Sequence, residues 1–142
     1  MKKLLLPLIA TTMLVGCSFA NGPRFTELET PKANESIIYY IRPVKSIGSG
    51  VYYTIYENGK PICKLDLGGY YAHRTTPGTK HIEAATDRKD ELIVEAEKGK
   101  RHYVLAEVSA GYLIAGPRLR EIDEDVALYF LNRSALSEPI KN

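Results

Sequence analysis

The sequence predicts a mainly β fold, a small antiparallel β-sandwich of seven to eight strands with a short C-terminal α-helix. From residue 36 onward, short segments alternate apolar and polar residues with a period of two, which is typical of half-buried strands. Turns that contain glycine or proline separate these segments at nearly even spacing. The chain also holds 10 Tyr and no Trp, and tyrosine favours strands.

The first strand is expected over residues 37–41, where apolar side chains occupy both faces and so predict a fully buried strand. Pro43 ends it, because proline cannot donate to a ladder. Strands over 51–57 and 60–65 flank Asn58-Gly59. This dipeptide predicts a hairpin, since a type I′ turn needs positive φ at both central positions.

The rest of the chain continues this pattern and then changes period. Further strands are expected over 70–74, 80–85, 91–96, 101–108 and 118–122. Residues 123–134 place Val126, Ala127, Phe130 and Leu131 at helical spacing. Asp123 is a candidate N-cap, and acidic residues in the first turn suit the helix dipole.

Composition bounds the function classes. The 142 residues are 44% hydrophobic and 25% charged, with a net charge of +2. This is the composition of one folded domain, and it excludes collagen-like, disordered and multi-span membrane proteins. The small net charge gives no indication of nucleic-acid binding. Two cysteines are too few for a disulfide scaffold.

The N-terminus has the features of a signal peptide over residues 1–16. A basic start, Met1-Lys2-Lys3, precedes an apolar run over residues 4–15. This run is shorter than the roughly 20 residues that span a bilayer.

The end of this segment, Leu14-Val15-Gly16-Cys17, resembles the lipobox of bacterial lipoproteins. In that family the cysteine receives a diacylglycerol and becomes the first mature residue. The resemblance implies that a covalent lipid on Cys17 anchors the protein to a membrane, and no other cofactor is expected. Ser18 in place of aspartate implies the periplasmic face of the outer membrane, by resemblance to lipoprotein sorting. A signal anchor, or a signal peptide with a chance cysteine, is the alternative.

Domain boundaries follow from these patterns. Residues 17–35 lack a sustained apolar period and contain loop signals at Asn21-Gly22-Pro23 and Thr30-Pro31, so a flexible tether is expected. The sandwich domain is expected over residues 36–135. Residues 136–142 are expected to form a frayed tail.

Several motifs of this domain resemble one family. The run 51–60 with its Asn-Gly-Lys hairpin, Gly69-Tyr70-Tyr71 and the run 77–84 are similar to a family of uncharacterised bacterial lipoproteins, catalogued as a domain of unknown function. The resemblance covers about residues 36–131, and 99–104 and 116–119 also fit it. More distantly, the chain is similar to PEGA-type surface domains, which are small β-sandwiches. The family implies a fold and an envelope location, but no activity.

The candidate binding residues are aromatic and apolar. Exposed tyrosines form binding surfaces because their rings offer contact area at a small entropic cost. The predicted surface comprises Tyr52, Tyr56, Tyr70 and Tyr71, with the loop residues Tyr112, Leu113 and Ile114. Cross-strand aromatic pairing is the alternative for the tyrosines. The loop is either tucked over the core or a docking site.

Catalytic and metal-binding patterns are weak. His73, His81 and His102 could bind zinc if their strands adjoin, but no closely spaced metal-binding pair is present, and solvent-facing polar residues are the alternative. No serine stands in a nucleophile-elbow motif. Cys63 is expected to be a small buried side chain, with an intermolecular disulfide as the alternative.

Taken together, the residues predict a non-enzymatic, membrane-anchored envelope lipoprotein that binds or scaffolds an envelope protein or peptidoglycan. A carrier of small molecules or lipids, with the apolar loop as a lid, is the first alternative. A metal-dependent hydrolase is the second.

Overall fold

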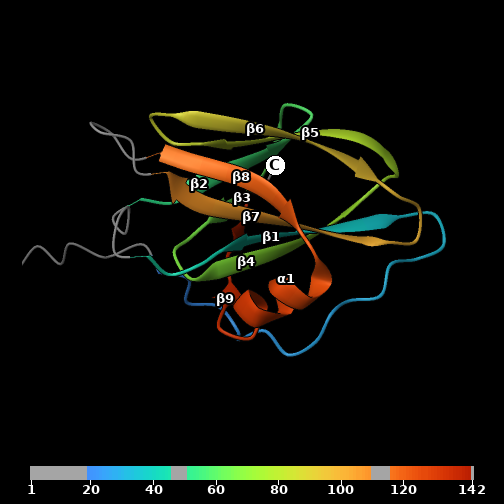
Figure 1. Ribbon diagram of the computed structural model, residues 1–142, viewed down its shortest axis with the longest axis horizontal. Helices are drawn as coiled ribbons and strands as arrows, with labels where there is room; N and C mark the ends of the chain where they lie inside the picture. Colours follow the sequence, from blue (N-terminus) through green and yellow to red (C-terminus); the bar gives the residue numbers. More distant parts are fainter. Residues whose placement is uncertain (1–18, 46–50, 110–115, 142) are drawn as a thin grey trace, which may run out of the picture.

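The computed structural model describes residues 19–45, 51–109 and 116–141, which form two packed β-sheets and one helix (Figure 1). The predicted mainly β sandwich with a C-terminal helix is confirmed. The elements are β1 Ser36–Arg42, β2 Tyr53–Glu57, β3 Lys60–Leu65, β4 Gly69–Thr75, β5 Gly78–Ala85, β6 Lys89–Ala96, β7 Arg101–Ser109, β8 Gly116–Ile122, α1 Glu124–Leu131, β9 Ala135–Leu136 and β10 Glu138–Pro139.

The strands divide into two five-stranded sheets. The order β8-β7-β1-β4-β9 forms the helix-side sheet, and β10-β3-β2-β5-β6 forms the outer sheet. Every pairing in the outer sheet is antiparallel. In the helix-side sheet, however, β1 pairs parallel with β7, and β4 pairs parallel with β9. The sandwich is therefore largely, but not wholly, antiparallel.

Strand β1 is buried along its whole length because it is covered on both faces. Ile38 and Tyr40 point into the core between the two sheets. Ile37, Tyr39 and Ile41 point the other way, into a second core beneath α1. The molecule thus has three layers, with the helix and the N-terminal segment on the outer side of the helix-side sheet (Figure 1).

The predicted hairpin joins β2 and β3. Asn58 and Gly59 have φ angles of 49° and 79°, which is the left-handed region that this turn requires. The pairing of β2 with β3 shifts register between Ile55 and Tyr56. Irregularities of this kind typically bend a strand and increase its twist.

The helix α1 docks through Ala127 and Leu131, which are fully buried. It is shorter than the expected 123–134. Asp123 occupies the N-cap position, but its side chain makes no capping hydrogen bond, so that part of the expectation is wrong. Glu124 ties the helix start to the sheet instead, because its carboxylate accepts a 2.6 Å hydrogen bond from the Tyr103 hydroxyl.

The expected flexible tether is wrong for residues 19–35, which pack along the helix-side sheet. Phe25 and Leu28 join the second core, and the Phe25 ring meets Tyr70 edge-on at 5.6 Å. The backbone N–H of Glu29 donates to the Tyr39 hydroxyl at 2.7 Å. The segment forms no helix or long strand, so its two apolar anchors leave no periodic signal in the sequence.

The expected frayed tail is also wrong for the described residues up to 141. Strand β9 extends the helix-side sheet beside β4, and β10 extends the outer sheet beside β3. Ser137 is buried between these strands, and the N–H of Ile140 donates to the carbonyl of Ile62 at 3.0 Å. Two-residue strands are too short to show an alternating pattern, yet they cover edges that would otherwise stay unpaired.

Candidate functional site

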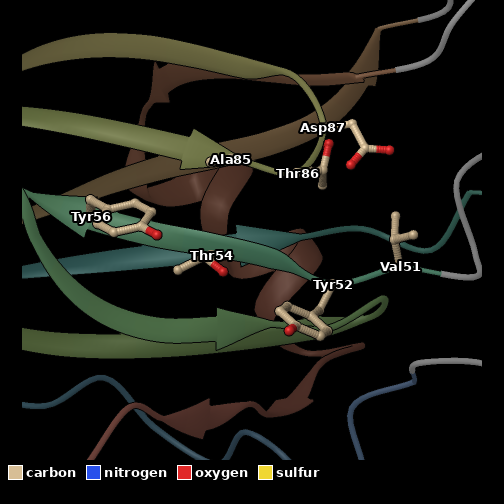
Figure 2. Close-up of a pocket in the computed structure, with 7 residues that line it drawn as sticks. All are labelled: Val51, Tyr52, Thr54, Tyr56, Ala85, Thr86 and Asp87. Atoms are coloured by element: carbon tan, nitrogen blue, oxygen red, sulfur yellow. The ribbon is translucent and has the colours of Figure 1, made fainter. Parts of the chain in front are cut away.

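Two of the predicted tyrosines line an open hollow on the solvent face of the outer sheet. The hollow has a volume of about 390 Å³. Figure 2 shows the side chains that surround it, which come from β2 with the residues before it and from the end of β5 with the turn that follows. These residues are Val51, Tyr52, Thr54, Tyr56, Ala85, Thr86 and Asp87.

The alternation of β2 creates this surface. Tyr53 and Ile55 point into the core, so Tyr52, Thr54 and Tyr56 face outward. In the neighbouring β5, Ala85 pairs with Thr54. Because alanine has so small a side chain, the space beside Thr54 stays open, and we name this feature the tyrosine hollow.

The chemistry of the tyrosine hollow is mixed. Tyr52 and Tyr56 present phenol rings, Thr54 and Thr86 present hydroxyls, and Asp87 adds a carboxylate (Figure 2). The Lys64 ammonium lies 5.2 Å from the centre of the Tyr52 ring, within the range of a cation–π contact. An open surface of this kind can stack on a ring or an apolar face and accept or donate hydrogen bonds at its edge.

The other predicted binding residues lie elsewhere. Tyr70 and Tyr71 belong to β4 of the helix-side sheet, and they point to opposite faces of it. Tyr70 packs in the second core, and Tyr71 packs against the core between the sheets. The structure therefore does not bring them to the tyrosine hollow. The remaining candidates, Cys17, Tyr112, Leu113 and Ile114, fall outside the described residues.

The three histidines do not form a common site. Each of them contacts a different glutamate instead. The pairs are His73 with Glu57 at 3.4 Å, His81 with Glu91 at 3.2 Å, and His102 with Glu121 at 3.0 Å. Within the described ranges, no group of three or more His, Cys, Asp or Glu side chains is placed to hold a metal ion.

His102 has a structural setting. Its Nε2 accepts a hydrogen bond of 3.0 Å from the backbone N–H of Glu97. This leaves Nδ1 to donate to the Glu121 carboxylate at 3.0 Å. The buried ring therefore joins the turn after β6 to β8.

A buried polar cluster that sequence reasoning missed links the two sheets. Glu57 of β2 contacts the Tyr40 hydroxyl at 3.3 Å and Lys80 Nζ at 3.6 Å, and it also accepts a hydrogen bond from Thr75. Lys80 Nζ donates to the Thr76 hydroxyl at 3.0 Å. These contacts of Glu57 join residues at least 17 positions apart in the chain, so no local sequence motif indicates them.

Burial shifts the pKa of two side chains that contact Glu57, namely Tyr40 and His73. It raises the pKa of Tyr40 well above its usual value, which keeps the phenol neutral and donating to Glu57. Burial also lowers the pKa of His73, and the Glu57 carboxylate partly opposes this effect. The carboxylate is thus held between a neutral phenol and a lysine ammonium.

Cys63 is fully buried between the sheets, which confirms its expected role as a small buried side chain. Burial raises the pKa of its thiol above the ordinary range. In a Cys17→Ala variant, where Cys63 is the remaining cysteine, we expect a thiol reagent such as DTNB to label almost none of the native protein and all of it in denaturant. Rapid labelling under native conditions would contradict this burial.

Comparisons with protein-family models, with curated proteins and with solved structures find no match. The resemblance drawn from the sequence motifs therefore stays a prediction. In the part of the chain that the structure describes, no helix is both long enough and apolar enough to cross a membrane.

Proposed function

We propose that the protein is a lipid-anchored, non-enzymatic binding module of the cell envelope, which engages its partner through the tyrosine hollow. The observation that carries the binding role is the pair of outward-facing rings, Tyr52 and Tyr56, beside polar groups on an open surface. Tyr56 lies in β2 and Tyr52 directly precedes it, so binding would cost little ordering entropy.

The anchor rests on the lipobox-like residues Leu14-Val15-Gly16-Cys17 behind a basic, apolar leader. One acyl chain gives only marginal attachment, at about 0.8 kcal/mol per buried CH₂. The two or three chains of a lipoprotein cysteine would hold the protein on the membrane essentially permanently. Ser18, the residue after the cysteine, supports the outer membrane as the location of the anchored protein.

The composition of the tyrosine hollow favours the sugar rings of the wall polymer as its ligand. The apolar face of a sugar stacks on a phenol ring, while its hydroxyls bond to threonine and carboxylate oxygens. Asp87 and Thr86 supply such oxygens at the edge of the hollow. A protein partner is the second candidate, because Val51 and Tyr52 are both exposed.

The carrier alternative has less support. A carrier of this fold would enclose its ligand between the sheets. That space is filled by large side chains, among them Tyr40, Tyr53 and Ile55, each at most 1% exposed. The tyrosine hollow, by contrast, is open.

The first test is binding of solubilised wall fragments, measured by calorimetry. Tyr52→Ala and Tyr56→Ala should each weaken binding by about five- to tenfold, which is the expected loss of one stacked ring. Tyr129→Ala, which removes an exposed tyrosine from α1, is the matched control and should bind like the unaltered protein.

Wild-type affinity in both hollow variants would overturn the tyrosine hollow as the sugar site. If the unaltered protein binds no wall fragment, crosslinking in intact cells decides on a protein partner. A partner captured by the unaltered protein but not by Tyr52→Ala would support the binding module. A partner that is captured equally by the unaltered protein and by the Tyr52→Ala and Tyr56→Ala variants would overturn the proposal that the protein binds through the tyrosine hollow.

A further inference from the structure

The described structure begins only two residues after Cys17. Phe19 forms a β-bridge with Leu67, and the N–H of Ala20 donates to the Leu67 carbonyl at 3.0 Å. Two residues reach at most about 7 Å. The headgroup layer of one leaflet is about as thick, roughly 5–8 Å. A lipid on Cys17 would therefore place Phe19 at headgroup depth.

The segment that follows is fixed to the domain. The N–H of Leu136 donates to the Pro23 carbonyl at 2.9 Å, and the N–H of Phe25 donates to the Ser134 carbonyl at 3.2 Å. Gly22 lies so close that a Cβ there would sit 2.4 Å from the Leu136 oxygen. From residue 19 onward the chain is therefore part of the domain, which holds the domain within about two residues of the anchor.

The surface beside this attachment point carries three exposed apolar or aromatic side chains. Phe19, Val44 and Tyr129 are 50%, 62% and 57% exposed, respectively. They surround two adjoining hollows of about 320 and 200 Å³, which share Val44, Gly68 and Arg133. Exposed aromatic side chains are favoured where a membrane meets water.

The charge of the same surface is positive. Arg24 and Arg133 belong to the linings of the two hollows, and these linings contain neither Asp nor Glu. The Arg133 guanidinium lies 4.0 Å from the centre of the Tyr129 ring. Among the described residues, neither of the two arginines forms an ion pair. Arg24 Nη1 donates to the Arg133 carbonyl at 3.3 Å, and Arg133 Nη1 donates to the Tyr129 carbonyl at 2.6 Å. Since a guanidinium carries five N–H donors, the others can bind phosphate oxygens.

We propose that this surface, the anchor face of Phe19, Val44, Tyr129, Arg24 and Arg133, rests directly on the anionic headgroups of the membrane. The inference depends on the proposed lipid on Cys17, which brings the face to the bilayer. Phe19 and Tyr129 enter the headgroup layer, and the two arginines bind lipid phosphates. The domain consequently has one fixed orientation on its membrane.

The absence of tryptophan from the sequence makes a clean test possible. The acylated full-length protein is reconstituted in vesicles of brominated phosphatidylcholine and phosphatidylglycerol, at about three to one, which quench nearby tryptophan. We expect strong quenching in a Tyr129→Trp variant. An Ile93→Trp variant is the matched control, because Ile93 is 55% exposed but lies on β6 of the outer sheet. The tryptophan fluorescence of this control should be the same in brominated and in unbrominated vesicles.

A second comparison tests the charge. In the Tyr129→Trp background, Arg24→Gln should lower the ratio of docked to undocked protein about fivefold. The control is Lys98→Gln in the turn after β6. The N–H of Gly99 in this turn donates to the carbonyl of Glu35, directly before β1, whereas Val44 lies just after the other end of β1. Lys98 is therefore at the opposite end of β1 from the anchor face. This control should leave the quenching unchanged.

The outcomes separate the two proposals. Mass spectrometry and flotation first show whether Cys17 carries lipid. A protein without lipid would overturn the anchor and, with it, the docking. Acylated protein that floats with vesicles, but shows equal quenching in the Tyr129→Trp and Ile93→Trp variants, would overturn the docking alone.

Discussion

Glu57→Gln is expected to destabilise the protein by about 3–5 kcal/mol, the cost of removing one partner of a buried ion pair. The side chains of Glu57 and Lys80 are only 7% and 8% exposed. Without the carboxylate, the lysine ammonium keeps one neutral partner, the Thr76 hydroxyl, in a site shielded from water. Tyr40 would also lose its charged acceptor.

Urea unfolding at pH 7 measures this effect. The matched control is Glu91→Gln, which removes an exposed glutamate that contacts His81 and Lys89, and it should cost less than about 1 kcal/mol. The double variant Glu57→Gln with Lys80→Met should recover much of the loss, because it removes both charges. A cost under about 1 kcal/mol for Glu57→Gln alone would show that the cluster contributes little to stability.

Local patterns in the sequence predict most of the fold. The alternation in β2 and β5 and the Asn58-Gly59 turn are properties of neighbouring residues, and the structure has them where they are expected. The double-sided apolar run of β1 likewise predicts a strand buried on both faces. What that run does not reveal is which element covers each face.

The parts that could not be predicted depend on pairing between distant segments. β4 joins β1 rather than β2 or β3, and this places Tyr70 and Tyr71 away from the tyrosine hollow. Tyr52 and Tyr56 line one hollow because Tyr56 lies in β2 and Tyr52 directly precedes it, on the face that the period of two predicts. The packing of residues 19–35 rests on isolated contacts such as Phe25 with Tyr70, which no periodicity shows.

Ile37→Ala and Ile38→Ala are each expected to cost about 2–5 kcal/mol, although the two residues are adjacent and point to opposite faces of β1. Both are 0% exposed. Ile38 fills the core between the sheets, and Ile37 fills the core beneath α1. In a simple two-layer sandwich one face of the strand would meet water, and one of the two changes would be nearly neutral.

Unfolding in denaturant compares the two variants with Ile93→Ala, which makes the same substitution at a solvent-facing position and should change stability by less than about 0.5 kcal/mol. If Ile37→Ala behaves like this control, the helix and the N-terminal segment do not form a third layer. If Ile37→Ala and Ile38→Ala both lower the free energy of unfolding by about 2–5 kcal/mol, the core beneath α1 contributes to stability as the core between the sheets does. Residues 19–35 then hold the domain close to Cys17, because Phe25 and Leu28 are part of that core.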